Sequence, residues 1–370
     1  MKIIIDDKIP FIRGILEPQA RVLYLPGGQI KPEDVVDADA LVVRTRTRVN
    51  KALLRDSKVS FVASATIGYD HIDREYLSLS GIKWTNCPGC NAESVAQYIT
   101  AVFVELAEKY SITLHGKVLG VIGAGNVGSR VIKKALALGM KALVNDPPRA
   151  EREGNDGFTD LEGVIGKSDF ITLHVPLLRE GKHKTFHLAN RMFFETMKPE
   201  AFIINTSRGE ILCNADLKTA LRKKIICGAV LDVWENEPGI DGELLSLVDI
   251  ATSHIAGYSA DGKSNGTAMS VQALSRFFHL GLDTWYPGNI PMSDPIIRNT
   301  EKGMEGIRQA VRATYDIFSD DRPLRNNPGS FEYNRDNYHN RREFHNYTVK
   351  ISDRETCEVL GKLGFKTLSV

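Results

Sequence analysis

Three side chains with complementary chemistry follow short apolar runs in the second half of the chain. His254 is suited to accept a proton because histidine titrates near neutral pH. A carboxylate such as Glu237 could orient the imidazole and favour its charged form, and Arg208 could clamp a carboxylate with two hydrogen bonds. Taken singly, each residue is more often structural than catalytic. Together they fit the removal of a hydride and a proton from a secondary alcohol beside a carboxylate.

A glycine motif could hold the cofactor that such a reaction needs. The apolar run 118–122 is followed by Gly123-x-Gly125-x-x-Gly128, a helical pattern, a second short strand and Asp146. The glycines permit a tight turn, close approach of a pyrophosphate and close packing of helix on strand. Asp146 can bind a ribose diol and repel a 2′-phosphate. A plain glycine turn is the alternative, but the order of elements favours NAD binding, with NAD preferred to NADP.

Composition limits the kind of protein. The chain has 370 residues, with 42% hydrophobic and 25% charged residues and a net charge of +1, which argues against a general nucleic-acid or membrane-surface binder. The first residues, MKIIIDDKIP, are typical of a strand and not of a signal peptide. Five scattered cysteines do not indicate a disulfide scaffold. We expect a cytoplasmic protein without a metal site.

The elements that must position these residues follow two α/β patterns. Residues 1 to about 92 contain apolar strands at 2–5, 40–43 and 60–63. Further strands at 170–173, 201–204, 229–231 and 249–252 alternate with helical segments, which indicates a parallel, doubly wound sheet. Ligands of such sheets lie at the carboxyl ends of the strands. Between the two patterns, residues 92–110 form a helix that is apolar on most faces and is therefore expected to be buried.

Two polar segments in the first part have open interpretations. The alternating arginines of residues 44–48 could be a solvated edge strand or could gather an anionic ligand. Cys87 and Cys90 have the spacing of a redox pair, but a tight turn with a small buried thiol is the preferred interpretation.

The last part of the chain has a different composition. Prolines and a glycine at 287–291 indicate a linker, a helix is expected at 301–318, and residues 319–342 form a turn-rich polar run. A strand at 347–351, a helix near 353–362 and a strand at 365–370 complete a separate α+β module of roughly eighty residues.

Four segments of the sequence resemble the D-isomer-specific 2-hydroxyacid dehydrogenases: GAGNVG at 123–128, NTSRG at 205–209, LDVWENEP at 231–238 and SHIAG at 253–257. Other segments are similar to a branch of that family that acts on a phosphorylated four-carbon acid. They are residues 88–91, 146–149 and 254–258, together with 320–325 and 341–343 in the C-terminal module. The resemblance covers essentially the whole chain.

The resemblance implies roles for individual residues. The catalytic set would be Arg208, Glu237 and His254, with His254 the proton acceptor. Cofactor contacts are expected from the glycine motif and the later strand ends: Gly123, Gly125, Asn126, Val127, Gly128, Asp146, Val175, Thr206, Ser207, Arg208, Asp232 and Gly257. Val175 stands where relatives often have threonine, so only a backbone contact is expected there. Substrate contacts would come from Thr45, which replaces a serine, and from Thr66 and Tyr258.

A substrate with a carboxylate at one end and a phosphate at the other needs two separated cationic anchors. Arg208 lies beside the hydride site and can serve only the carboxylate. We therefore expect Arg44, next to Thr45, to bind the phosphate. Arg341 or Arg342 from a partner chain is the alternative.

The expected fold is α/β. A Rossmann NAD-binding domain (93–257) would stand beside a flavodoxin-like substrate-binding domain (1–92 and 258–284) and a C-terminal dimerisation module (285–370). The resemblance implies NAD-dependent oxidation of 4-phosphoerythronate at C2, in pyridoxal phosphate biosynthesis in a bacterial cytoplasm, by a homodimer. Another D-2-hydroxyacid dehydrogenase, such as one acting on phosphoglycerate, and an NAD-sensing corepressor-like protein are the alternatives.

Overall fold

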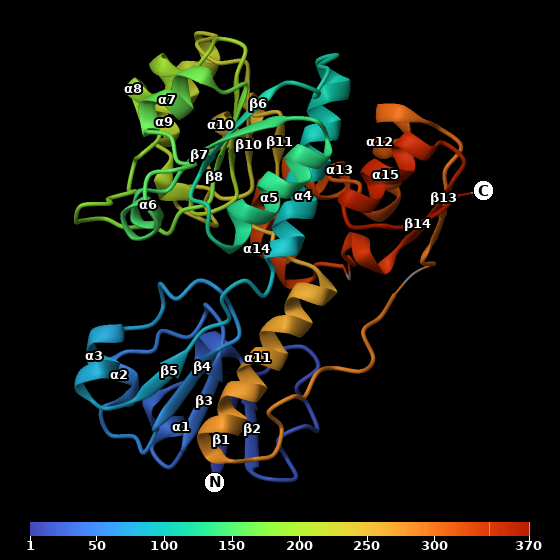
Figure 1. Cartoon of the computed structure of the whole chain (residues 1–370). Coiled ribbons are helices and arrows are strands. Elements are labelled where there is room, and N and C mark those ends of the chain that lie inside the picture. The colour runs from blue at the N-terminus through green and yellow to red at the C-terminus, as the bar shows by residue number, and fades with distance from the viewer. Residues whose placement is uncertain (293, 340, 370) are drawn as a thin grey trace. The chain divides into compact units, whose positions relative to one another are not determined.

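The chain folds into two compact units, seen in a computed structural model that describes residues 1–292, 294–339 and 341–369 (Figure 1). The first unit consists of Met1–Asn91 and Ser259–Pro291. The second consists of Ala92–Tyr258 and Met292–Val370. The three-domain division expected from the sequence remains a prediction.

A five-stranded parallel sheet forms the centre of the first unit, in the order β2-β1-β3-β4-β5, which is the flavodoxin-like order. Its elements are β1 (Lys2–Asp6), β2 (Arg21–Leu25), α1 (Pro32–Val35), β3 (Ala40–Val43), α2 (Lys51–Leu54), β4 (Phe61–Ser64), α3 (Arg74–Leu79), β5 (Lys83–Thr85) and α11 (Ala260–Phe278). The predicted strands β1, β3 and β4 are confirmed. Val271 and Leu274 bring α11 into the core of this sheet although they lie far away in the sequence.

A six-stranded parallel sheet forms the centre of the second unit, in the order β11-β10-β9-β8-β6-β7, so the predicted doubly wound fold is confirmed. Its strands are β6 (Val118–Ile122), β7 (Lys141–Asn145), β8 (Phe170–Leu173), β9 (Phe202–Asn205), β10 (Gly228–Leu231) and β11 (Ile250–Ala251). One face packs on α4 (Ala92–Lys109) and α5 (Asn126–Ala137). The other packs on α7 (Leu161–Lys167), α8 (Arg191–Thr196), α9 (Asn214–Arg222) and α10 (Gly242–Leu247), while α6 (Pro147–Glu153) follows β7. Helix α4 is buried as expected.

The expectation of a turn-rich run at 319–342 is wrong, although residue 340 lies outside the described residues. Two helices occupy most of it, α13 (Phe318–Asn326) and α14 (Phe331–Asp336). Leu324 and Phe331 are fully buried in the same cluster as Trp234, which follows β10 of the large sheet. These two apolar residues, seven positions apart in a polar stretch, are enough to anchor the helices. The energy of their packing outweighs the weak helix propensity of the segment and the cost of Pro323 inside α13.

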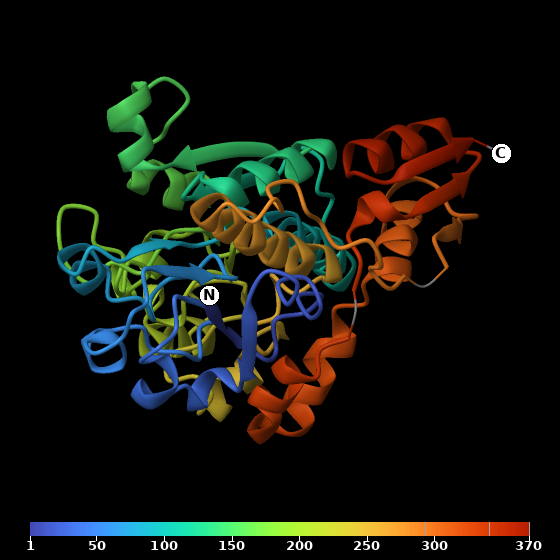
Figure 2. The same cartoon turned by 90° about the horizontal axis from the view of Figure 1, so that it is seen from below.

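The remaining C-terminal elements form a small sheet in the order β12-β13-β14. They are β12 (Ile296–Arg298), α12 (Gly303–Thr314), β13 (Thr348–Ile351), α15 (Arg354–Lys362) and β14 (Lys366–Ser369); Val370, which the sequence assigns to the last strand, lies outside the described residues. Figure 2 shows α13 and α14 apart from this small sheet, and α13 packs on β11 of the large one.

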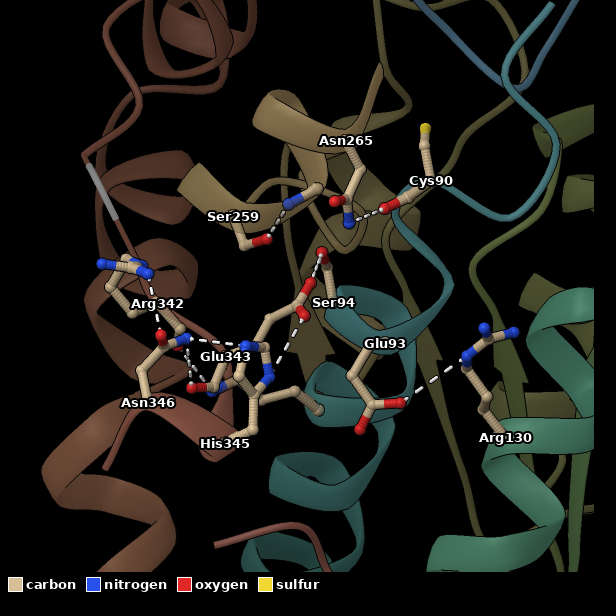
Figure 3. Close-up of polar contacts among 12 residues, drawn as sticks. Cys90, Glu93, Ser94, Arg130, Ser259, Asn265, Arg342, Glu343, His345 and Asn346 are labelled. Carbon is tan, nitrogen blue, oxygen red and sulfur yellow. Dashed lines mark hydrogen bonds and ion pairs between the residues drawn. The ribbon is translucent and has the colours of Figure 1, made fainter. Parts of the chain in front are cut away.

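The C-terminal segment is also tied to α4 by buried polar contacts. The Ser94 hydroxyl donates to Glu343 at 2.8 Å, and the Gln97 amide donates to the Arg342 carbonyl at 3.1 Å (Figure 3 shows Ser94 and Glu343). These side chains are almost fully buried, so the contacts help to fix the segment on the second unit.

Cys87 and Cys90 are free thiols that are buried in the first unit. The Cys90 amide donates to the Cys87 carbonyl at 3.2 Å, which closes the expected tight turn, and the Cys90 carbonyl accepts from Asn265 (Figure 3). Burial raises the pKa of Cys87 to about 11, so this thiol is not activated for redox exchange. Among the described residues, no helix is both long and apolar enough to cross a membrane.

Candidate active site

His254 and Glu237 form an ion-pair geometry at the carboxyl end of the large sheet. His254 follows β11, and its Nδ1 lies 2.7 Å from Glu237 Oε2. The other carboxylate oxygen of Glu237 accepts a hydrogen bond from the Trp234 amide at 2.9 Å. Because Nδ1 faces the carboxylate, Nε2 is the nitrogen that can accept a proton from a substrate.

The surroundings keep Glu237 ionised. Burial by itself would raise its pKa, but the charge of His254 and hydrogen bonds from the imidazole and the Trp234 amide lower it below the ordinary value. Arg335 of α14 adds to this lowering. An ionised Glu237 fixes the ring and stabilises the imidazolium that forms when His254 takes a proton.

Asp232, just after β10, holds the loop that carries His254. One carboxylate oxygen accepts from the Thr252 hydroxyl at 2.6 Å and the Ile255 amide at 2.7 Å, and the other accepts from the Ala256 amide at 3.0 Å. The Asp232 carbonyl accepts from the His254 amide at 2.7 Å. The side chain is therefore used to build the loop that contains Gly257, while the expected cofactor contact of Asp232 remains a prediction.

Arg208 lies on the loop after β9, which is shaped by Asn205. The Asn205 side chain accepts from the amide and hydroxyl of Ser207 and donates to the Arg208 carbonyl at 2.9 Å. A Cβ on Gly209 would lie 2.0 Å from the Trp234 backbone, so only glycine lets this loop pack against the loop that leads to Glu237. Asn205 was not among the predicted site residues, although it opens the NTSRG segment.

The glycine motif has the expected construction. Gly123 has φ +90°, and a Cβ there would lie 2.5 Å from the His174 carbonyl oxygen; a Cβ on Gly128 would lie 2.1 Å from the Gly123 oxygen. A Cβ on Gly125 would meet no atom within 4 Å. Helix α5 begins at the next two predicted residues, Asn126 and Val127. Gly123 and Gly128 are thus required by the chain's own packing, and Gly125 leaves room for a ligand.

Asp146 lies beside this motif. One of its oxygens accepts from the Ala124 amide at 2.8 Å, and the other caps α6 through the Arg149 amide at 3.0 Å. The Arg149 guanidinium donates to the Ala124 carbonyl at 2.7 Å and pairs with Glu153. Val175 follows β8, and its Cγ1 would lie 2.8 Å from a Cβ on Gly123, so it too borders the motif.

The residues present fit a dinucleotide. A glycine turn at a helix N-terminus, an adjacent carboxylate and open space at Gly125 match what a pyrophosphate and a ribose require. The buried Thr206 hydroxyl has no hydrogen-bond partner among the described residues. An unpaired buried hydroxyl is costly, so this atom is available to a bound ligand.

The predicted substrate residues of the first unit lie at the carboxyl ends of neighbouring strands. Arg44 and Thr45 follow β3, and Thr66 follows β4. Arg44 Nε lies 3.1 Å from the fully buried Asp6 carboxylate, while Thr45 is exposed. The Thr66 hydroxyl donates to the Gly68 carbonyl at 3.0 Å and pairs with the Ser64 hydroxyl at 2.8 Å.

The predicted contacts of the second unit are partly buried. The ring of Tyr258 packs edge-on against Tyr338, with centroids 5.7 Å apart. Arg341 and Arg342 expose only 2% and 7% of their surface within their own chain.

Comparison with known proteins agrees with this geometry. Residues 94–256 match the family "D-isomer specific 2-hydroxyacid dehydrogenase, NAD binding domain", and residues 296–364 match a domain of unknown function, DUF3410. The cofactor of this family domain is NAD, as expected from the glycine motif. A solved D-lactate dehydrogenase from Aquifex aeolicus, complexed with NAD and lactic acid, is 25% identical with a TM-score of 0.64, covering 76% of this chain and 97% of that chain.

The similarity to curated relatives covers nearly the whole chain, including its C-terminal segment. An erythronate-4-phosphate dehydrogenase from Bacteroides fragilis is 47% identical over 353 residues, covering 95% of this chain and 100% of the relative. One from Escherichia coli is 39% identical over 379 residues, covering 100% and 99%. The resemblance inferred from the sequence is confirmed, and the chain belongs to the erythronate-4-phosphate dehydrogenases, a branch of the D-isomer-specific 2-hydroxyacid dehydrogenase family.

Proposed function

We propose that this protein oxidises the C2 hydroxyl of 4-phospho-D-erythronate to give 3-hydroxy-2-oxo-4-phosphooxybutanoate, with NAD, as a step of pyridoxal 5′-phosphate biosynthesis. The observation that carries the proposal is the His254–Glu237 pair, 2.7 Å apart at the end of the sheet that also bears the glycine motif. Relatives of this name that match nearly the whole chain support the choice of substrate.

The chain's own residues provide acid–base chemistry and positioning. His254 Nε2 takes the proton of the C2 hydroxyl, and Glu237 stabilises the imidazolium that results. Arg208 binds the carboxylate at C1 and so orients C2. NAD held at the glycine motif beside Asp146 would supply the acceptor for the hydride that leaves C2. The alcohol loses one hydride and one proton, so the step needs no further reactant.

The cofactor contacts that we propose lie at the carboxyl ends of the strands of the second unit. They are Gly123, Gly125, Asn126, Val127, Gly128, Asp146, the backbone of Val175, Thr206, Ser207, Arg208, Asp232 and Gly257. The Asp146 carboxylate beside the glycine motif favours NAD over NADP, because a 2′-phosphate would meet a like charge.

The substrate contacts that we propose are Arg44, Thr45, Thr66 and Tyr258. Arg44 would bind the phosphate with its terminal nitrogens, because only its Nε is engaged with Asp6. We further propose a cytoplasmic homodimer formed through residues 285–370, with residues 1–92 and 258–284 as the substrate-binding domain and 93–257 as the NAD-binding domain.

Steady-state turnover of a panel of 2-hydroxy acids tests the proposal. We expect 4-phosphoerythronate with NAD to be oxidised with a far higher kcat/KM than phosphoglycerate, lactate or unphosphorylated erythronate, and NADP to be a poor cofactor. Preference for phosphoglycerate would identify another dehydrogenase of the family. Tight NADH binding without turnover of any acid would identify an NAD-sensing binding protein.

A further inference from the structure

The loop of residues 252–258, called the catalytic loop here, carries the proposed base His254 together with Gly257 and Tyr258. His254 has φ +57°, a left-handed conformation that L-residues with side chains seldom adopt. Such a conformation persists only when the surroundings determine it. Asp232 supplies part of that constraint from the large sheet.

The rest of the constraint comes from the C-terminal segment. Arg341 exposes 2% of its surface, and its Nη2 donates to the Ala256 carbonyl at 2.9 Å. Its guanidinium carbon lies 4.0 Å from the ring centroid of Tyr315, and its Nε and Nη1 have no hydrogen-bond partner among the described residues. The one hydrogen bond that this buried guanidinium is seen to make is thus directed at the catalytic loop.

Tyr338 supports the same loop from its side. Its ring packs edge-on on Tyr258, and its hydroxyl donates to Asp320 at 2.9 Å. Asp320 also accepts from the Tyr315 hydroxyl at 2.8 Å and lies in the field of Arg341. Arg341, Tyr338 and Asp320 are therefore one connected cluster, which fixes the position of each member.

Helix α14 extends these contacts to Ser253, the neighbour of His254. The Asn334 side chain donates to the Ser253 hydroxyl at 3.4 Å, next to His254. Arg335, which is largely buried, lies in the field of Glu237 and pairs with Glu332 at 3.4 Å. Phe331 anchors this helix in the core cluster that contains Trp234, whose amide binds Glu237.

We propose that Asn334, Tyr338 and Arg341 are positioning residues that hold the catalytic loop in its active conformation, so that the C-terminal segment, part of a domain of unknown function, is required for hydride transfer and not for assembly alone. Misplacement of a catalytic group by about 1 Å can reduce a rate by about a hundredfold. The inference rests on the proposed function, because it takes His254 as the base.

Arg341→Lys is compared with Arg325→Lys, a matched control. Arg325 also donates to backbone carbonyls of the second unit, those of Leu245 at 2.6 Å and Val248 at 2.9 Å, which belong to the end of α10 and not to residues 252–258. We expect both variants to lower the midpoint of thermal unfolding. Only Arg341→Lys should lower kcat with 4-phosphoerythronate, by tenfold or more, with the Kd for NADH within about threefold of the unmodified enzyme.

Equal kcat values for the two variants would overturn the inference. If Arg341→Lys does not fold, Asn334→Ala replaces it, with Asn337→Ala as control because the Asn337 side chain, at the C-cap of α14, donates to the Tyr333 carbonyl of that helix. We expect about a threefold lower kcat for Asn334→Ala alone; equal kcat for this pair would overturn the inference as well. Absence of turnover in the unmodified enzyme would instead refute the proposed function.

Discussion

At the scale of single residues, His254, with its left-handed backbone, and the partly buried Glu237 form the catalytic pair that we propose. The His254 amide is bound by the Asp232 carbonyl and its ring by Glu237, so neither the main chain nor the side chain is free to turn. The sequence places these two groups 17 residues apart, and the fold brings them within 2.7 Å. A base held in this way needs no reorganisation when the substrate binds.

His254→Ala should lower kcat by about a hundred- to ten-thousandfold, because the C2 hydroxyl loses its proton acceptor. NADH binding, measured by fluorescence, should be nearly unchanged. His183→Ala is the control, since His183 also faces a glutamate, Glu151 at 3.4 Å, but outside the catalytic loop. Near-normal turnover of His254→Ala would exclude the mechanism.

Glu237→Gln should move the acidic limb of the plot of kcat/KM against pH to lower pH, because an amide at this position does not favour the imidazolium form of His254.

Arg44→Ala should raise the KM for 4-phosphoerythronate strongly and hardly change the KM for unphosphorylated erythronate, because an arginine–phosphate contact is charge-assisted. The buried Asp6 carboxylate offers a competing role, since it needs the Arg44 charge. Circular dichroism and thermal unfolding of the variant separate the two roles. Equal rises of KM for both substrates with a lower unfolding midpoint would assign Arg44 to the fold.

The pairing of the candidate catalytic residues His254 and Glu237 could be predicted from residue type and position at strand ends, whereas the other contacts around them could not. Asp232 shows the limit. A carboxylate after a strand is compatible with a ligand contact, but here both oxygens accept hydrogen bonds from the catalytic loop. Arg341 reaches this loop from 85 residues further on. Nothing in the local pattern indicates such long-range contacts.

At the scale of elements, Gly128 and Gly125 in the turn between β6 and α5 are needed for different reasons, the first for the packing of the chain and the second for space beside a ligand. Gly128→Ala should disturb the turn itself, because the new Cβ would lie 2.1 Å from the Gly123 oxygen. Gly125→Ala should leave thermal stability nearly unchanged, since its Cβ would meet open space, but should weaken NAD binding at least tenfold. Calorimetry for stability and titration for affinity give both values. NAD affinity that survives Gly125→Ala would move the pyrophosphate elsewhere.

His174, at the end of β8, should make the stability of the folded protein sensitive to acid. Burial lowers the pKa of His174 to about 3, against about 6.5 in an unfolded chain. Between these two pKa values the unfolded state binds more protons at His174 than the folded state. The contribution of His174 to the free energy of unfolding is therefore complete above pH 6.5 and decreases as the pH is lowered. Between pH 6.5 and 5 the free energy of unfolding should decrease by about 2 kcal/mol. His174→Asn should flatten the dependence of the unfolding midpoint on pH over this interval; an unchanged slope would contradict the assignment.

The central strands and α4 could be predicted because burial on both faces gives uninterrupted apolar runs. The edge strands β2 and β5 could not, since they are partly exposed and contain charged residues. Helices α13 and α14 were missed for a similar reason: Leu324 and Phe331 carry the packing of a mostly polar stretch. In these segments tertiary packing, and not local pattern, decides the structure.

At the scale of the whole molecule, the C-terminal segment has two separate tasks in our proposals. Helix α14 and the residues that follow it contact the catalytic loop of the same chain. The small sheet contributes Ile297, Val349 and Ile351 from one face to the cluster that also contains α4 and the large sheet. The alternate positions, which include Ile296 and Leu368, are exposed by 39% and 50% and offer a surface for a second copy.

Leu368→Asp should therefore convert a dimer, twice the 41.1 kDa of one chain, into a monomer, because an unpaired charge in an interface is costly. Light scattering after size exclusion measures the mass. Leu79→Asp is the control, since Leu79 is 82% exposed in the first unit. The monomer should keep its kcat, because Arg341 binds Ala256 within one chain. A monomeric but inactive variant would show that a residue of the partner chain is needed for turnover, and a variant that stays dimeric would place the interface elsewhere.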